Sequence, residues 1–290
     1  MPDESTLFLE HQPLLVAIGY RVLGSHADAE DVAQEAWLRW ATTDQAAVES
    51  PRRFLITVVT RLAIDRLRRA HRRHEVYPGP WLPEPVPTGK LGPAETAEQR
   101  DTVSLATMRL MNQLSAPERA VFVLREGFEL PYEEIGRALD LEEAHARQLY
   151  RRATARLSAD RERFPADPHR HRELVARFLQ AARTGDRAGL QRLLAQEVTV
   201  WIDGGGKRSA ALRPVVGAER ASRLVLGTLG KYADVALRIA DVNGQDALLV
   251  RLGGEWQVCS FETAGGLITG IQWMSNPEKL SLFSGERSAS

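Results

Sequence analysis

Cysteine is almost absent from this chain of 290 residues, because Cys259 is the only one in the sequence. A single cysteine excludes an internal disulfide and any zinc site built from several cysteines. Long apolar runs are also absent, and none approaches the ~18 residues that cross a bilayer. The chain begins with acidic residues, and Glu10 and His11 interrupt its first apolar stretch, which argues against a secretory signal. We therefore expect a cytoplasmic protein that makes no membrane contact.

Net charge is absent too, since 38 basic side chains balance 38 acidic ones. This balance argues against an indiscriminate polyanion-binding protein. The charges are nevertheless separated along the chain: residues 25–49 carry six acids and one base, 50–75 carry eight arginines and two acids, and 145–163 carry six arginines and two acids. One acidic and two basic segments indicate one contact with a basic partner and two with a polyanion, although any single run would also suit a solvated helix face.

Periodicity divides the chain into helical and mixed parts. Apolar residues recur at helical spacing over residues 1–75 and again over 104–163. Between them, residues 76–103 hold six prolines, which cannot continue a helix or a central strand, so we interpret this segment as a linker. Over residues 168–283, glycines are frequent and turn residues separate short apolar runs, which predicts an α+β domain with an antiparallel sheet. Residues 284–290 are expected to form a flexible tail.

Residues 131–153 have the pattern of a helix-turn-helix. A short helix over 132–139 and a turn near Asp140 precede a second helix whose apolar residues recur at spacings of three and four. The outer face of the second helix carries side chains that can bond guanine and adenine edges in the major groove. These candidate recognition residues are Arg147, Gln148, Arg151 and Arg152. Helical hairpins also occur as plain packing units, so the pattern alone does not establish DNA binding.

Three segments resemble parts of extracytoplasmic-function sigma factors, the smallest sigma factors of bacterial RNA polymerase. Residues 114–157 resemble region four, residues 28–35 resemble the helix of region two that docks on the polymerase clamp, and residues 61–68 resemble the adjoining part that meets the minus-ten promoter element. The resemblance implies a polymerase contact through Asp28, Asp31, Gln34 and Glu35. It implies DNA contacts through Arg61, Arg66, Arg68 and Arg69, with the recognition residues named above reading the minus-thirty-five element.

Three further motifs resemble those of SigJ-like sigma factors, which carry a fused SnoaL-like carboxy-terminal domain. The resemblance implies that this domain regulates the sigma core in cis, and that the motifs form interdomain contacts. The motifs are Trp81, Leu82, Pro83, Glu84 and Pro85 in the linker, then Asp203, Gly204, Gly205, Gly206 and Lys207, and finally Asn276, Pro277, Glu278, Lys279 and Leu280. Glu278 stands where aspartate is usual, and Asp140 stands where the turn usually has glycine.

The predicted architecture is two all-α sigma domains followed by an α+β domain. Region 2 is expected over residues 1–75, region 4 over 104–163, and the cone-shaped SnoaL-like domain over 168–283. The expected function is promoter-specific initiation of transcription with core RNA polymerase and promoter DNA as partners. No catalytic residue, metal or cofactor is predicted.

Two alternatives remain open at this point. An enzyme would need a buried acid or base, but we expect His169 and His171 to lie on the surface and Cys259 to be a core thiol. A one-component regulator would join a DNA-binding half to a half that senses a small molecule, and it would bind its promoter without polymerase. A ligand pocket would have walls among Trp201, Trp256, Phe261 and Trp273, although a role in the core is the favoured interpretation for these four residues.

Overall fold

The computed structural model describes residues 4–74, 76–91, 103–161 and 167–283. The chain divides into two compact units, each formed by two segments. The first unit combines Met1–Glu75 with Gly89–Asp160, and the second combines Val76–Thr88 with Arg161–Ser290. The first part of the proline-rich linker therefore belongs to the same unit as the carboxy-terminal domain.

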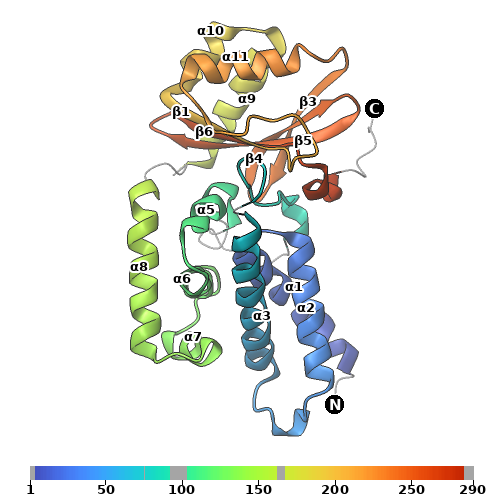
Figure 1. Ribbon diagram of the computed structural model, residues 1–290, viewed down its shortest axis with the longest axis vertical. Coiled ribbons are helices and arrows are strands. Elements are labelled where there is room, and N and C mark those ends of the chain that lie inside the picture. The colour runs from blue at the N-terminus through green and yellow to red at the C-terminus, as the bar shows by residue number, and fades with distance from the viewer. Residues whose placement is uncertain (1–3, 75, 92–102, 162–166, 284–290) are drawn as a thin grey trace. The chain divides into compact units, whose positions relative to one another are not determined.

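Three helices form the amino-terminal part of the first unit: α1 (Glu4–Leu23), α2 (His26–Ala41) and α3 (Pro51–His74) (Figure 1). Ser25 caps α2 by accepting a hydrogen bond from the Asp28 backbone N–H at 3.2 Å. Proline at the first position of α3 costs no hydrogen bond, because the first N–H groups of a helix have no partner within it. The apolar spacing of α2 predicts a buried stripe, and its buried members are Ala29, Val32, Ala33, Ala36 and Trp40. Trp37, which has the same spacing, is only partly buried.

In the described part of the first unit after the linker, further helices are joined by short loops. They include α5 (Leu105–Leu110), α6 (Ala116–Phe122), a single π-helical turn (Val123–Gly127), α7 (Tyr132–Leu139) and α8 (Glu143–Arg161). Asp140 ends α7 in the left-handed conformation, with φ of 57° and ψ of 50°, and so fills the turn position where glycine is usual. The predicted seam of α8 is buried and consists of Ala146, Leu149, Ala153 and Leu157.

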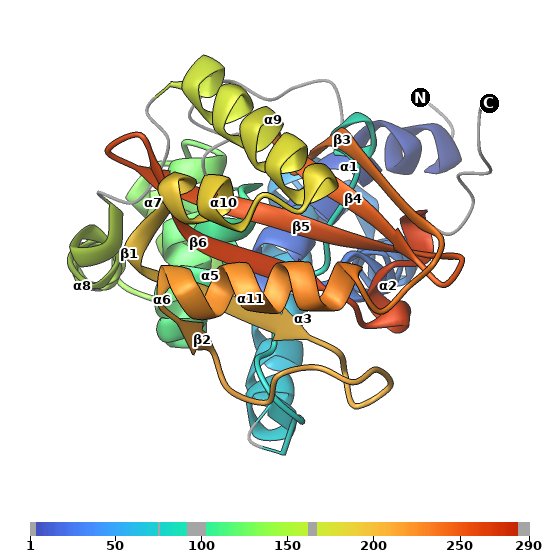
Figure 2. The same ribbon diagram turned by 90° about the horizontal axis from the view of Figure 1, so that it is seen from above.

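The second unit packs three helices on one face of a six-stranded sheet (Figure 2). The helices are α9 (Pro168–Thr184), α10 (Arg187–Leu193) and α11 (Ala218–Leu229). The strands are β1 (Leu194–Asp203), β2 (Val215–Val216), β3 (Val235–Val242), β4 (Gln245–Leu252), β5 (Glu255–Ala264) and β6 (Leu267–Met274). Their order is β2-β1-β6-β5-β4-β3, and only the β1–β6 pair is parallel.

Residues with positive φ angles form the turns of the β3–β4, β4–β5 and β5–β6 hairpins. Asn243 and Gly244 adopt φ of 54° and 76° between β3 and β4, as a type I′ turn requires. The β1–β6 pairing brings the carboxyl end of β1 beside the end of β6, with Asp203 opposite Met274. This pairing brings the second and third predicted interdomain motifs together.

One histidine prediction is wrong. His171 is only 3% exposed, and its ring lies 2.9 Å from the Asp246 carbonyl oxygen and 3.5 Å from the Thr263 hydroxyl. The helical repeat of α9 places it on the same buried face as Leu174 and Phe178. His169 is exposed, as expected, and Cys259 is buried in the core.

Candidate functional site

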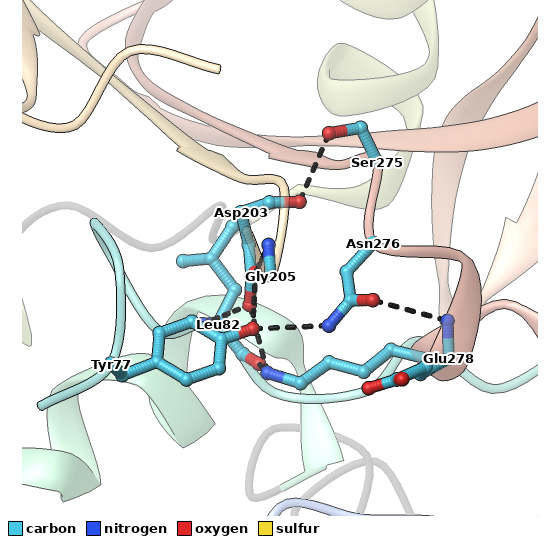
Figure 3. Close-up of polar contacts among 8 residues, drawn as sticks. Tyr77, Leu82, Asp203, Gly205, Ser275, Asn276 and Glu278 are labelled. Atoms are coloured by element: carbon cyan, nitrogen blue, oxygen red, sulfur yellow. Dashed lines mark hydrogen bonds and ion pairs between the residues drawn. The ribbon is translucent and has the colours of Figure 1, made fainter. Parts of the chain in front are cut away.

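A buried carboxylate at the end of β1 binds the proline-rich linker. Asp203 is 0% exposed. Its Oδ1 accepts a hydrogen bond from the Tyr77 hydroxyl at 2.6 Å, and its Oδ2 accepts one from the Leu82 backbone N–H at 3.0 Å. Figure 3 shows the Tyr77 hydroxyl directed toward Asp203 and Asn276, whose Nδ2 donates to that hydroxyl at 3.0 Å. We call Asp203, Asn276 and Lys279 the linker-binding site.

Lys279 supplies the opposite charge. Its Nζ lies 2.8 Å from Asp203 Oδ2 and donates to the Leu82 carbonyl oxygen at 2.6 Å. The same ammonium lies 4.1 Å from the centre of the Trp81 ring and 5.2 Å from that of Tyr77, which adds cation–π attraction. Burial lowers the pKa of Lys279, while the charge of Asp203 opposes that shift. Burial and the hydrogen bond to Asp203 together raise the pKa of Tyr77, so its hydroxyl stays a donor.

The glycines after Asp203 are required by close approach of other groups. Gly205 has a φ of 59°, and a Cβ there would lie 2.3 Å from Asn276 Nδ2. A Cβ on Gly206, at a φ of 70°, would lie 2.9 Å from Pro78. Lys207 points elsewhere, because its Nζ pairs with Glu278 at 3.2 Å and its side chain is 57% exposed.

The linker has a second attachment that the sequence did not reveal. The Val86 N–H donates to Asn243 Oδ1 at 2.8 Å, and the Asn243 N–H donates back to the Val86 carbonyl at 2.9 Å. Thr88 donates from its hydroxyl to Asp241 Oδ1 at 2.5 Å and accepts from the Gly244 N–H at 2.8 Å. Asn243 reads as a turn residue in the sequence, and nothing in a turn motif signals that its side chain binds a segment 157 residues earlier.

On the acidic face of α2, Gln34 and Glu35 are exposed. The other two residues of the predicted polymerase contact form ion pairs with α3. Arg66 of α3 pairs with Asp28 at 2.5 Å and with Asp31 at 2.8 Å. One predicted DNA-binding arginine thus neutralises two of the predicted polymerase-binding acids. Glu35 pairs with Arg39 within the helix at 2.8 Å.

The other predicted arginines of α3 divide between two environments. Arg61 donates from Nε to the Ala138 carbonyl at 2.9 Å and from a terminal nitrogen to the Arg137 carbonyl at 3.4 Å, so it binds the end of α7. Arg68 lies 3.6 Å from the Asp65 carboxylate, and Arg69 bonds the Asp65 carbonyl oxygen. Asp65 therefore pairs with an arginine of its own helix.

The four recognition residues of α8 are all exposed. Arg147 pairs with Glu143 and lies 4.9 Å from the centre of the Tyr132 ring. Arg152 lies 3.6 Å from the buried Glu118. Gln148 and Arg151 form no side-chain hydrogen bond or ion pair with another described residue, and are therefore the freest to reach a DNA base.

Comparison with known proteins assigns the two helical segments. The family model for Sigma-70 region 2 matches residues 7–73, and the model for Sigma-70 region 4 matches residues 104–157. The chain is 39% identical over 237 residues to the ECF RNA polymerase sigma factor SigJ of Mycobacterium tuberculosis, which covers 80% of this chain and 76% of SigJ. This chain belongs to the extracytoplasmic-function (ECF) sigma factors.

Two further comparisons extend this result over almost the whole sigma factor. It is 30% identical over 282 residues to a probable ECF sigma factor SigI of M. tuberculosis, covering 95% of this chain and 94% of SigI. The crystal structure of M. tuberculosis SigJ superposes with a TM-score of 0.77 at 31% identity, and covers 96% of this chain and 98% of that one. The predicted fold class, two helical sigma regions and a carboxy-terminal α+β domain, is confirmed.

Sigma factors bind core RNA polymerase and promoter DNA and direct the initiation of transcription, and this chain is one of them. Among the helices in the described parts of this sigma factor, none is both long and apolar enough to cross a membrane. The same ranges hold no cluster of three or more histidine, cysteine or acidic residues that could bind a metal ion.

Proposed function

We propose that the carboxy-terminal domain regulates this sigma factor in cis by holding the linker between regions 2 and 4. The observation that carries the proposal is the buried Asp203 carboxylate, which accepts hydrogen bonds from Tyr77 and Leu82 of the linker. A buried carboxylate without its partners is costly. Release of the linker would take away the hydrogen bonds that Tyr77 and Leu82 donate to this carboxylate, so the linker-binding site stabilises the linker-bound state.

The length of free linker gives this contact a regulatory consequence. Regions 2 and 4 have to reach separate promoter elements, and an extended chain spans at most ~3.3–3.6 Å per residue. Attachments at Leu82 and at Val86 and Thr88 remove this stretch from the free tether between the two regions. The carboxy-terminal domain thereby sets how far the two DNA-binding regions can separate.

The residues for the two partners are proposed from the resemblance to sigma regions two and four and from their charge. We assign the polymerase contact to Asp28, Asp31, Gln34 and Glu35 on α2, where complementary charge sets the rate and register of docking. Arg147, Gln148, Arg151 and Arg152 are assigned to the minus-thirty-five element. Arg61, Arg66, Arg68 and Arg69 are assigned to DNA near the opened promoter, where phosphate contacts position the protein without reading sequence.

The test is promoter-specific transcription in vitro with core RNA polymerase and the full chain. Asp203→Asn removes the charge that faces Lys279 and weakens both linker contacts, and we expect transcript yield to change by about fivefold or more. Asp234→Asn is the matched control, because Asp234 is an exposed acid of the same domain that forms a surface ion pair with Arg251. Equal yields for wild type and Asp203→Asn, with the linker shown to be released, would refute regulation through the linker.

A further inference from the structure

The carboxy-terminal domain contains a cavity of about 580 Å³ beside the linker-binding site. This volume lies within the range of small-molecule sites, ~300–1,000 Å³. The apolar part of the wall includes Leu224 of α11, Leu252 of β4 and Trp273 of β6. Among the four aromatic residues considered for a pocket wall, only Trp273 lines this cavity. Phe261 lies in the core. The guanidinium carbons of Arg238 and Arg251 lie 5.0 Å and 6.0 Å from the centre of the Trp256 ring.

The polar part of the wall favours an anion. Three basic residues line the cavity, namely Lys207, Arg208 and Lys231, and one acidic residue, Glu255, also lines it. Arg208 pairs with Glu255, and Lys207 pairs with Glu278. Lys231 is exposed, and its ammonium has no partner among the described residues.

A buried amide in the wall adds a hydrogen-bond donor. Gln257 is only 5% exposed, and its Oε1 accepts a hydrogen bond from Trp273 Nε1 at 2.7 Å. This bond fixes the orientation of the amide. No hydrogen bond to another described residue uses the Gln257 side-chain nitrogen, so its two N–H groups are available to an acceptor on a bound molecule.

The cavity and the linker-binding site share the same short segments of chain. Lys207 and Arg208 line the cavity, and their backbone N–H groups bond the carbonyl of Gly204, which directly follows Asp203. Ser275 also lines the cavity, and both its N–H and its hydroxyl donate to the Asp203 carbonyl at 2.9 and 3.0 Å. A molecule that shifts this wall therefore shifts the residue that holds the linker.

We propose that this cavity binds a small amphipathic anion, with an apolar body against Trp273 and Leu252 and a charged group near Lys231, and that its occupancy alters the hold on the linker. The effect of the anion on the linker rests on the proposed cis-regulation, whereas its binding to the cavity does not.

Binding is tested with two fluorescent probes that differ by one charged group. The anion is 8-anilino-1-naphthalenesulfonate, and its uncharged relative is N-phenyl-1-naphthylamine. We expect the full chain to bind the anion about tenfold more tightly than the uncharged probe. Lys231→Glu should remove that preference and leave the uncharged probe unaffected. Arg220→Glu is the matched control, because Arg220 is an exposed base at the start of α11 that does not line the cavity.

A filling variant tests the position of the site. Thr228 lines the cavity from α11, so Thr228→Trp should abolish binding of both probes while circular dichroism keeps the wild-type spectrum. Anion binding that survives both Lys231→Glu and Thr228→Trp, or that falls equally with Arg220→Glu, would overturn the site.

The coupling to the linker is measured separately, by hydrogen exchange at the Leu82 amide. Saturating 8-anilino-1-naphthalenesulfonate should change that exchange rate several-fold in the wild type and leave it unchanged in Thr228→Trp. An unchanged rate in the wild type with the probe bound would overturn the coupling. Failure of the proposed cis-regulation is a different result, namely unchanged transcription by Asp203→Asn, and it leaves the probe-binding data intact.

Discussion

At the scale of one residue, Glu118 both caps α6 and forms ion pairs with arginines of α8. Its Oε2 accepts hydrogen bonds from the Ser115 N–H at 3.0 Å and the Ser115 hydroxyl at 2.9 Å, which caps α6. The same carboxylate pairs with Arg156 at 2.7 Å and lies 3.6 Å from Arg152. Burial alone would raise the pKa of Glu118, but the bonds from Ser115 and the two arginine charges lower it below its ordinary value.

We predict that Glu118→Gln lowers the free energy of unfolding around α6 by ~1–3 kcal/mol at pH 7. A pKa that is lower in the folded chain stabilises the fold above the unfolded value of ~4.3, and this contribution is lost as pH falls through the folded value. The difference between variant and wild type should therefore shrink below about pH 4. Native-state hydrogen exchange at α6 amides measures the loss of stability in the variant and its change with pH. Glu143→Gln, in an exposed pair with Arg147, is the control and should cost at most ~0.5 kcal/mol; a deficit for Glu118→Gln that does not vary with pH would contradict the account.

Gly205 offers a second prediction at this scale. Gly205→Ala should release the linker, because the new Cβ would meet the Asn276 side chain, and the Leu82 amide should exchange at least tenfold faster. Gly265→Ala is a closely matched control: its φ of 58° carries the same left-handed penalty of ~1–2 kcal/mol, but a Cβ there meets nothing within 4 Å. Similar exchange at Leu82 in the two variants would show that backbone strain, and not the contact with Asn276, is what matters.

At the scale of the element, α8 presents a polar face on which some side chains are held by ion pairs and others are not. Gln148 and Arg151 are exposed and unpaired among the described residues, whereas Arg147 is held by Glu143 and stacks on Tyr132. We predict that Gln148→Ala and Arg151→Ala each cost ~1–3 kcal/mol at the preferred promoter and relax specificity at one base position. Transcription by the holoenzyme from a library of minus-thirty-five sequences measures this, with Ser158→Ala on the same helix as control. A uniform loss over all sequences would assign these residues to phosphate contact instead.

The proposed polymerase contact on α2 has its own test. Asp28 and Asp31 also neutralise Arg66, so changing them disturbs α3 as well. The double variant Gln34→Arg with Glu35→Arg avoids that pair and should weaken binding to core RNA polymerase by about tenfold or more, measured by fluorescence anisotropy. Glu10→Arg, a charge reversal at an exposed position of α1, should leave binding unchanged. Equal affinity of the double variant and wild type would remove α2 from the interface.

The elements themselves were largely predictable, because each depends on spacing within a short window. The α2 stripe, the buried seam of α8, the left-handed Asp140 and the hairpin turns at Asn243 follow from helical and strand periods and from turn chemistry. Contacts between distant segments did not follow. The buried face of α9 that contains His171 depends on a sheet formed later in the chain, and the bond between Val86 and Asn243 joins two segments with no local signal of each other.

At the scale of the whole molecule, regions 2 and 4 contact each other within the first unit. Arg61 binds carbonyl oxygens at the end of α7, and Arg53 pairs with Glu134 of α7 at 2.9 Å. Arg119 of α6 is fully buried and donates twice to the Arg21 carbonyl at the end of α1, at 3.2 and 3.1 Å. The DNA contact proposed for Arg61 requires its hydrogen bonds to the carbonyl oxygens of α7 to break.

We therefore predict that regions 2 and 4 separate when core RNA polymerase binds. Dyes at Ala27→Cys on α2 and Ala144→Cys on α8, both exposed positions, report the distance by energy transfer. Cys259 should stay unlabelled, since it is buried and burial raises the pKa of its thiol. Transfer efficiency should fall on addition of core enzyme and stay constant with serum albumin. Constant efficiency with bound core enzyme would contradict the separation.

The order of the linker and its binding site along the chain has a consequence during protein synthesis. Leu82 precedes Lys279 by 197 residues, and ribosomes add ~5–20 residues per second. The region 4 match ends at residue 157, which is 122 residues before Lys279, so regions 2 and 4 are complete for about 6–24 s before the ammonium that clamps the linker exists. Each newly made molecule passes through an interval with an unclamped tether, during which it is free to meet polymerase before its own restraint has been translated.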